Sequence, residues 1–302
     1  MDGFVTIANE AAAPRLRDQL MLGVKRLAAA GVDSPRLDAE VLLGHCLAMT
    51  REQLVGAGDL PLTLAAVRAF EWLLRRRSQR QPIAYIIGKQ EFWSLDFLVT
   101  ADVLIPRPET ERLVEVALLC ATQFSANKPL RIADLCTGSG AVAVSLATEL
   151  PTAQFCATDI SAAALQIGRA NAELHYVAQR IEFVAGDLFE AQGLRRSSFD
   201  LIVSNPPYVR RADIGALAPE VSQWEPRAAL DGGVDGCDFY RRIAAAAPDY
   251  LAEQGALALE IGAHMASDVC AICAETGRYR EIQIFQDYAG RDRVVLARAG
   301  KS

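Results

Sequence analysis

The stretch LRIADLCTGSGAVAVSLATEL, residues 130–150, decides the fold of this 302-residue chain. Its first part, LRIADL, is largely apolar and predicts a buried strand, and AVAVSLATEL at its other end predicts a helix. Gly138 and Gly140 stand between them, and their missing side chains let a backbone come close to a ligand. We therefore expect a strand, a ligand-binding turn and a helix in direct succession.

The same alternation of strand and helix continues along the chain. Further strands are predicted at 153–159, 180–187, 199–205 and 255–262, helices at 162–174, 238–251 and 265–275, and strand-like runs at 280–287 and 293–298. This order predicts an α/β fold with an open, mostly parallel sheet wrapped by helices. Ligands of such sheets bind outside the carboxyl ends of the strands.

The amino-terminal part has a different character, and the length of the chain favours two domains. Helical spacing of apolar residues covers 14–31, 34–48 and 63–80. The basic cluster Arg75–Arg80 suits a helix carboxyl end and solubility, and its alternative is a patch that faces an acidic partner. A stretch rich in β-branched and aromatic residues follows and predicts a hairpin. We expect a helical domain at 1–81, a β-hairpin linker at 82–107 and the main domain at 108–302.

Composition and charge argue against several classes of protein. The chain is 51% apolar and 23% charged, as soluble globular proteins are, and we find no bilayer-spanning apolar run and no signal-type amino terminus. A net charge of −6 argues against a nucleic-acid backbone as the main partner. Seven scattered cysteines suit reduced thiols in a cytoplasm. We expect Cys270 and Cys273 to form a half-buried helix face and not a metal site.

The loop after the first strand indicates a nucleotide-like ligand without identifying it. GSGAVA satisfies the pattern G-x-G-x-x-A, and Asp159 follows about twenty residues later. Dehydrogenases and other nucleotide-using families share these features, which predict only an adenosine-like ribose whose hydroxyls Asp159 would bind. Asp159 could instead cap the next helix, a role that Ser161 would fill equally well. Leu188, after the third strand, could cover an adenine ring.

The fourth strand ends in DLIVSNPPYVRR, residues 200–211, which no dehydrogenase needs. Asn205 carries one acceptor oxygen and two donor hydrogens, and the two prolines hold the carbonyls of Asn205 and Pro206 at fixed angles. Tyr208 adds an aromatic face, which also favours a cationic sulfonium methyl group. We call residues 205–208 the clamp. It could hold a planar amide or an amino-substituted base with its nitrogen aligned toward an electrophile.

The glycine loop and the clamp together fit a methyltransferase that uses S-adenosyl-L-methionine, and their combination resembles the amino-methyltransferases with an (N/D)-P-P-Y motif. The chain further resembles the HemK/PrmC family, which methylates glutamine N5 in the Gly-Gly-Gln loop of peptide-chain release factors. The resemblance covers nearly the whole chain and rests on AYIIGKQEFW, VLIPRPETE, DLCTGSGAVAV, DLIVSNPPYV, EPRAAL, GCDFYRRI and RDRVVLA.

The resemblance implies a Rossmann-like class I methyltransferase sheet, with S-adenosyl-L-homocysteine as the product of the cofactor. Asp159 would bind the ribose, Leu188 would lie beside the adenine, and Asn205 would touch both cofactor and substrate. Cys136 stands where the broader methyltransferase class often has glycine, and we expect it to keep an ordinary φ. The cofactor loop would be Cys136, Thr137, Gly138, Ser139 and Gly140, and the glutamine would be held by Asn205, Pro206, Pro207 and Tyr208.

Three other functions stay open at this point. A flipped adenine or cytosine would suit the same clamp, the protein could be a non-catalytic adapter, and a relative methylates a glutamine of a large-subunit ribosomal protein. The acidic charge opposes the first, the intact loop and clamp oppose the second, and IPRPETE and EFW favour the release-factor branch over the third. We expect a cytoplasmic monomer with no membrane or nucleic-acid partner, whose helical domain recognises the release factor. The long loop at 209–238 is expected to act as a lid.

Overall fold

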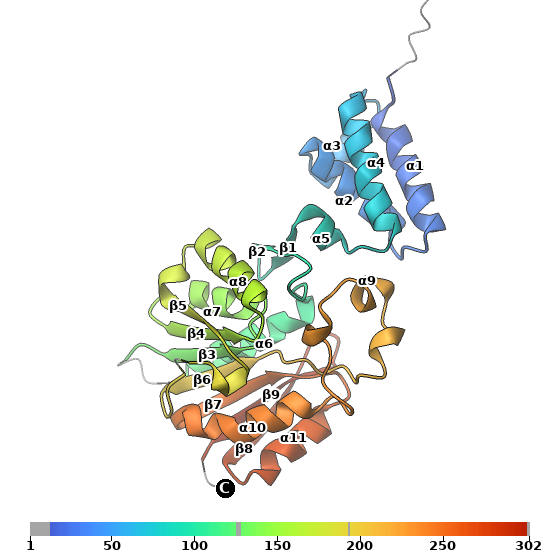
Figure 1. Ribbon diagram of the computed structural model, residues 1–302. Helices are drawn as coiled ribbons and strands as arrows, with labels where there is room; N and C mark the ends of the chain where they lie inside the picture. Colours follow the sequence, from blue (N-terminus) through green and yellow to red (C-terminus); the bar gives the residue numbers. More distant parts are fainter. Residues whose placement is uncertain (1–12, 125–127, 193, 301–302) are drawn as a thin grey trace, which may run out of the picture. The chain divides into compact units, whose positions relative to one another are not determined.

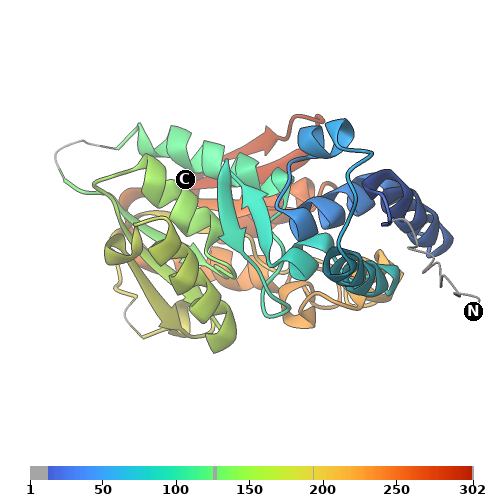
Figure 2. The ribbon, with the colours of Figure 1, turned by 90° about the horizontal axis from the view of Figure 1, so that it is seen from above.

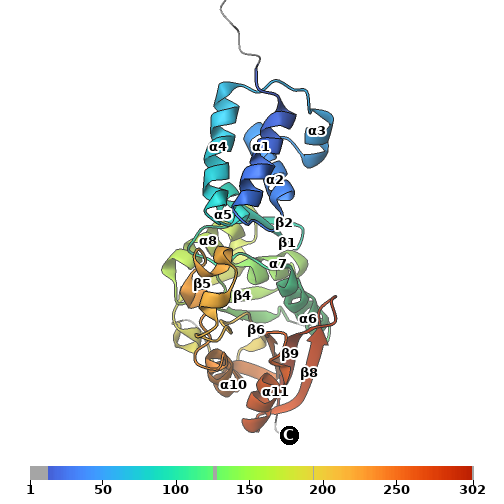
Figure 3. The same cartoon turned by 90° about the vertical axis from the view of Figure 1, so that its right-hand side faces the viewer.

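The computed structural model describes residues 13–124, 128–192 and 194–300, and the chain divides into two compact units, Met1–Ile87 and Gly88–Ser302. In the first unit, helices form at 16–29, 35–47 and 64–78, where apolar spacing predicts them, and a short helix at 51–56 was not predicted (Figures 1 and 3). Phe70 is completely buried in this unit, and Gly23 makes room for it, because a Cβ there would lie 2.8 Å from the Phe70 ring. The helices are α1 (Leu16–Ala29), α2 (Pro35–Leu47), α3 (Arg51–Gly56), α4 (Leu64–Ser78) and α5 (Ile83–Ile87).

One arginine of the basic cluster Arg75–Arg80 is buried in the helical unit. Arg77 is 6% exposed, and its guanidinium pairs with Asp38 of α2 at 2.7 Å. Arg76 lies over the Trp72 ring and donates to the backbone carbonyls of α5. These two arginines therefore stabilise the bundle itself, in addition to the expected role of the cluster at a helix carboxyl end.

The segment after the bundle differs from the prediction. Residues 83–87 form α5, and the hairpin is shorter than expected, with β1 (Lys89–Phe92) paired to β2 (Leu95–Leu98) (Figure 2). The β-branched composition of this stretch favours a strand, but Ile86 is buried in the core of the bundle and its N–H donates to the Pro82 carbonyl. Tertiary burial thus overrides the local preference.

The second unit is built on a seven-stranded sheet with the order β5-β4-β3-β6-β7-β9-β8 (Figure 1). The first five of these strands are parallel, and β9 is antiparallel to both of its neighbours. The predicted open, mostly parallel sheet is confirmed. The strands are β3 (Arg131–Leu135), β4 (Gln154–Asp159), β5 (Ile181–Ala185), β6 (Phe199–Ser204), β7 (Leu251–Glu260), β8 (Tyr279–Gln286) and β9 (Asp292–Ala299).

Helices cover both faces of the sheet because successive strand residues point to opposite sides. Leu201 packs in one core cluster with α6 (Glu111–Ala121), α7 (Ala141–Glu149) and α8 (Ala162–Leu174). Its neighbour Ile202 packs in the other, with α10 (Asp238–Tyr250) and α11 (Ala266–Glu275). Cys273 is buried in this second cluster and Cys270 packs against it, so the expected helix face is confirmed. The shorter elements are η1 (Pro108–Thr110), η2 (Ala178–Arg180), η3 (Leu188–Glu190), η4 (Ile214–Ala216), α9 (Pro219–Ser222) and η5 (Arg227–Ala229).

The register of the parallel strands aligns their carboxyl ends. Leu135 of β3 pairs with Thr158 of β4 and with Ser204 of β6, and Ser204 pairs in turn with Leu259 of β7. The residues that follow these paired positions on the four strands therefore lie in one row across the sheet, with about 4.8 Å between neighbouring strands. We call this the edge row, and in spatial order its members are Asp159, Cys136, Asn205 and Glu260.

Candidate functional site

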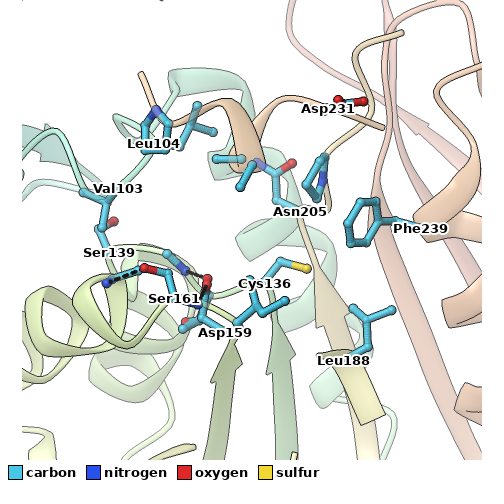
Figure 4. Close-up of a pocket in the computed structure, with 18 of the residues that line it drawn as sticks. Val103, Leu104, Cys136, Ser139, Asp159, Ser161, Leu188, Asn205, Asp231 and Phe239 are labelled. Atoms are coloured by element: carbon cyan, nitrogen blue, oxygen red, sulfur yellow. Dashed lines mark hydrogen bonds between the residues drawn. The ribbon is translucent and has the colours of Figure 1, made fainter. Parts of the chain in front are cut away.

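A cavity of about 770 Å³ opens at the edge row (Figure 4). Eight of the predicted site residues line it, and they come from the ends of β3, β4 and β6 and from the loop after β5. Gly140, Pro206 and Tyr208 are not among the residues that line the cavity. The predicted residues that do are Cys136, Thr137, Gly138, Ser139, Asp159, Leu188, Asn205 and Pro207.

The two loop glycines have different surroundings. Both have positive φ, 54° at Gly138 and 78° at Gly140. A Cβ at Gly138 would meet nothing within 4 Å, so its backbone is open to a ligand. A Cβ at Gly140 would lie 3.2 Å from the Gly168 Cα, so this glycine allows α7 to begin close to α8.

Cys136 adopts a left-handed backbone with φ of 58°, so the expected ordinary φ is wrong. The reason lies in the next residue, because the Thr137 N–H must turn back to reach the Thr158 carbonyl at 2.9 Å. The Thr137 hydroxyl also donates to Asp134 at 2.6 Å. Burial, with Asp159 nearby, raises the pKa of the Cys136 thiol far above its usual range, so the thiol stays protonated.

Asp159 fixes the shape of the glycine loop. Its Oδ2 accepts from the Gly138 N–H and its Oδ1 from the Ser161 N–H, both at 2.9 Å. The cap of α8 is Ser161, whose hydroxyl accepts from the Ala164 N–H at 3.1 Å, so Asp159 does not fill that role. Burial raises the pKa of the Asp159 carboxyl, while the backbone N–H groups oppose this shift. The carboxylate therefore faces the cavity as a rigid acceptor.

The clamp is held from two directions. Asn205 Nδ2 donates to the Thr110 hydroxyl oxygen at 3.2 Å, which orients the side-chain amide. Tyr208 packs against the core cluster under α10 and α11, and burial raises its pKa to about 12, so the phenol stays neutral. Gly232 approaches the Tyr208 backbone so closely that a Cβ would lie 2.7 Å from its Cα. Core packing therefore fixes Tyr208, and Asn205 and Pro207 reach the cavity.

Sequence reasoning did not assign several residues that shape the site. Thr110, from the stretch that leads into α6, lines the cavity. Val103 and Leu104 from the same stretch and Phe239 of α10 line it as well (Figure 4). Val103, Leu104 and Thr110 belong to the motif VLIPRPETE, residues 103–111. This motif supports the family resemblance, but no role in the site was assigned to it from the sequence. Glu260 was also missed, although it ends an apolar strand as Asp159 does; it is 1% exposed, and burial raises its pKa to about 7.

The loop at 209–238 forms one wall of the cavity. It contains η4, α9 and η5, and Val209 forms a bridge to Asp231. Glu225, whose side chain is 1% exposed, pairs with Arg107 from the segment before α6. The loop residues that line the cavity are Arg211, Pro226, Ala228, Ala229, Asp231, Gly233 and Asp238.

In the described part of the chain, no helix is long and apolar enough to cross a membrane, and no three His, Cys, Asp or Glu side chains are grouped to hold a metal ion.

Two family models match the chain: the PrmC N-terminal domain over residues 18–88 and the methyltransferase small domain over residues 115–220. The catalytic domain of hMettl16, solved with the MAT2A 3′UTR hairpin 6, is similar with a TM-score of 0.52 over 77% of this chain and 81% of that chain, at 16% identity. That similarity concerns the fold alone, which is the predicted Rossmann-like methyltransferase fold.

Whole-length relatives are more informative. The release factor glutamine methyltransferase of Geobacter sulfurreducens is 46% identical over 91% of this chain and 93% of its own length. The protein of the same name from Moorella thermoacetica is 45% identical over 93% of this chain and 98% of its own. One from Cereibacter sphaeroides is 44% identical over 94% and 98%. The resemblance is thereby confirmed, and the chain belongs to the release factor glutamine methyltransferase family.

Proposed function

We propose that this protein transfers the methyl group of S-adenosyl-L-methionine to the side-chain N5 of the glutamine in the Gly-Gly-Gln motif of peptide-chain release factors. The observation that carries the proposal is the edge row, which brings the glycine loop, Asp159 and the clamp to one cavity. Relatives that bear the name release factor glutamine methyltransferase match this chain over nine-tenths of its length, which supports the substrate.

The cofactor side of the cavity fits S-adenosyl-L-methionine. The open space at the Gly138 Cα admits a ligand against the backbone, and Asp159 offers carboxylate oxygens to ribose hydroxyls. Leu188, an apolar side chain on the cavity wall, would cover the adenine. The bound cofactor supplies an electrophilic methyl group on a sulfonium and leaves as S-adenosyl-L-homocysteine.

The substrate side has to make a poor nucleophile react. The lone pair of an amide nitrogen is delocalised, and the clamp offers no histidine or lysine as a base. In the proposed mechanism the two N–H groups of the glutamine amide are accepted by the Asn205 side-chain oxygen and by the carbonyl of Pro206, which lies between the cavity-lining residues Asn205 and Pro207. These two bonds align its nitrogen with the methyl group, so orientation and electrostatics lower the barrier. The displaced proton passes to water.

The test is methyl transfer to a purified release factor, followed by mass spectrometry of the peptide that contains Gly-Gly-Gln. We expect one added methyl group on the glutamine, and none when that glutamine is replaced by alanine. Asn205→Ala should lower the rate on the order of 100-fold, with cofactor affinity changed much less. An unmethylated release factor, or Asn205→Ala turning over at the wild-type rate, would contradict the proposal.

We further propose that the chain acts as a cytoplasmic monomer with three parts. The helical part at 1–81 would recognise the release factor away from the glutamine, the segment at 82–107 would link it, and residues 108–302 would carry the catalysis. All seven cysteines are free thiols, which supports a reducing compartment. Light scattering of the purified protein tests the monomer, and a dimer at micromolar concentration would contradict it.

A further inference from the structure

Glu260 is a buried carboxyl group that the proposed transfer does not use. It ends β7 and stands next to Asn205 in the edge row. Glu260 is 1% exposed, and its Oε2 has no hydrogen-bond partner among the described residues. Burying a carboxyl oxygen without a hydrogen-bond partner costs folding free energy, which suggests that Glu260 has a role beside the clamp.

Thr110 links this carboxyl group to the clamp. Thr110 is 4% exposed and ends η1, directly before α6. Its hydroxyl accepts from Asn205 Nδ2 at 3.2 Å, and the same hydroxyl lies close enough to the Glu260 carboxyl group to lower its pKa as a hydrogen-bond donor. A threonine hydroxyl has one hydrogen, so donation to Glu260 leaves only lone pairs for Asn205. The amide of Asn205 must then turn its NH₂ group to Thr110 and its oxygen to the other side.

We propose that Thr110 and Glu260 are positioning residues, which fix the Asn205 amide with its oxygen presented to the methyl-accepting nitrogen. The inference rests on the proposed function, since it concerns the same transfer. A free asparagine amide can flip, and the flipped form would present an NH₂ group to the N–H of the substrate. The hydroxyl and the carboxylate remove that unproductive form before the substrate binds, which is preorganisation of a hydrogen-bond acceptor.

The surroundings of Glu260 keep the carboxylate in place. The Tyr240 hydroxyl donates to the Glu260 carbonyl at 2.9 Å. Arg293 from β9 and Arg107 lower the pKa of its carboxyl group, and Glu109 raises it. The phenols of Tyr208 and Tyr240 lie near enough for the charge of Glu260 to raise their pKa values. Burial exceeds all of these and raises the pKa of Glu260 to about 7. A protonated Glu260 could donate to Thr110, which would let the Asn205 amide flip, so turnover should fall as the pH drops below about 7.

The experiment compares kcat, KM and cofactor Kd for Thr110→Val, Thr110→Ser and Thr122→Val on a release factor. Thr110→Val should lower kcat about 10- to 100-fold with little change in cofactor Kd, because only the orientation of the amide is lost. Thr110→Ser restores the hydroxyl and should recover most of that loss. Thr122, at the other end of α6, is exposed and donates to the Leu119 carbonyl at 2.7 Å, so Thr122→Val is the matched control.

Glu260→Gln provides a second readout, the pH profile of kcat. The glutamine side chain of this variant cannot ionise, so the decline of kcat below about pH 7 should disappear. If Glu260 had a purely structural role, the substitution would leave the pH profile of kcat unchanged. Wild-type protein that fails to methylate the release factor refutes the proposed function. If the wild type is active, Thr110→Val within about threefold of its kcat overturns the inference alone. If Thr110→Val does not bind cofactor, an unaltered pH profile in Glu260→Gln overturns it instead.

Discussion

Gly236→Ala should displace the backbone of the clamp, although Gly236 lies outside the clamp itself. Gly236 is buried in the loop at 209–238, has φ of 83°, and its added Cβ would lie 2.6 Å from the Tyr208 carbonyl oxygen and 3.2 Å from the Met265 Cε. The methionine end can move, but the carbonyl belongs to the backbone of the clamp. Gly277 is the matched control, since it is exposed, has φ of 63°, and offers its Cβ open space within 4 Å.

The two substitutions separate backbone strain from packing. A left-handed alanine costs about 1–2 kcal/mol at either position, and a forced contact in a packed region adds about 1–3 kcal/mol at Gly236 alone. The free energy of unfolding should therefore fall by about 2–5 kcal/mol for Gly236→Ala and by about 1–2 kcal/mol for Gly277→Ala.

Urea unfolding, cofactor titration and methyl transfer to a release factor test this together. Because the displaced atom is the Tyr208 carbonyl, Gly236→Ala should also lower kcat by about tenfold or more, with cofactor Kd nearly unchanged. Gly277→Ala should leave kcat near the wild-type value. Equal destabilisation by the two variants, with equal kcat, would refute the reasoning.

Three further predictions concern the cavity wall and its support. Asp159→Asn keeps one acceptor oxygen for two backbone N–H groups, so cofactor Kd should rise about 10- to 100-fold by calorimetry, and an unchanged Kd would contradict the role of Asp159. Arg107→Ala leaves Glu225 buried without its partner and should cost about 3 kcal/mol of unfolding free energy, and adding Glu225→Gln should recover much of it in urea melts. Burial raises the pKa of Asp134 from 3.8 to about 7, so the folded state holds this proton more tightly and wild-type stability is lost as the pH rises between those values. Asp134→Asn should gain up to about 4 kcal/mol relative to wild type between pH 4 and pH 8, and a constant difference would exclude this linkage.

The sequence carried the main features of the site because strand ends are local signals. Apolar runs that stop at Asp159 and at Asn205 mark the ligand edge of a parallel sheet without any knowledge of pairing. The same rule would have selected Glu260, whose ALALE run ends in an acid. The strand after the clamp is followed by no glycine loop or proline pair, so the sequence carries no second local signal of a site at Glu260.

Other features depend on contacts that no local pattern reports. The helix at 83–87 forms because Ile86 is buried in the bundle, against its β-branched composition. The left-handed φ of Cys136 follows from the hydrogen bond between Thr137 and Thr158. The bond from Asn205 to Thr110 joins residues 95 positions apart, so its partner could not be read from spacing.

The position of Glu260 beside Asn205 depends on an irregularity far from the cavity. At the start of β6, Phe199 pairs with Leu251, but Leu201 pairs with Ala256, so two steps along β6 match five along β7. Without those three extra residues, Asn205 would lie opposite Leu257, and Glu260 would extend about 10 Å beyond the edge row. Gly255 permits the irregularity, because a Cβ there would lie 3.0 Å from the carbonyl oxygens of both Ala252 and Phe199. The geometry at the clamp therefore originates at the opposite end of the sheet, in the way β6 and β7 begin to pair.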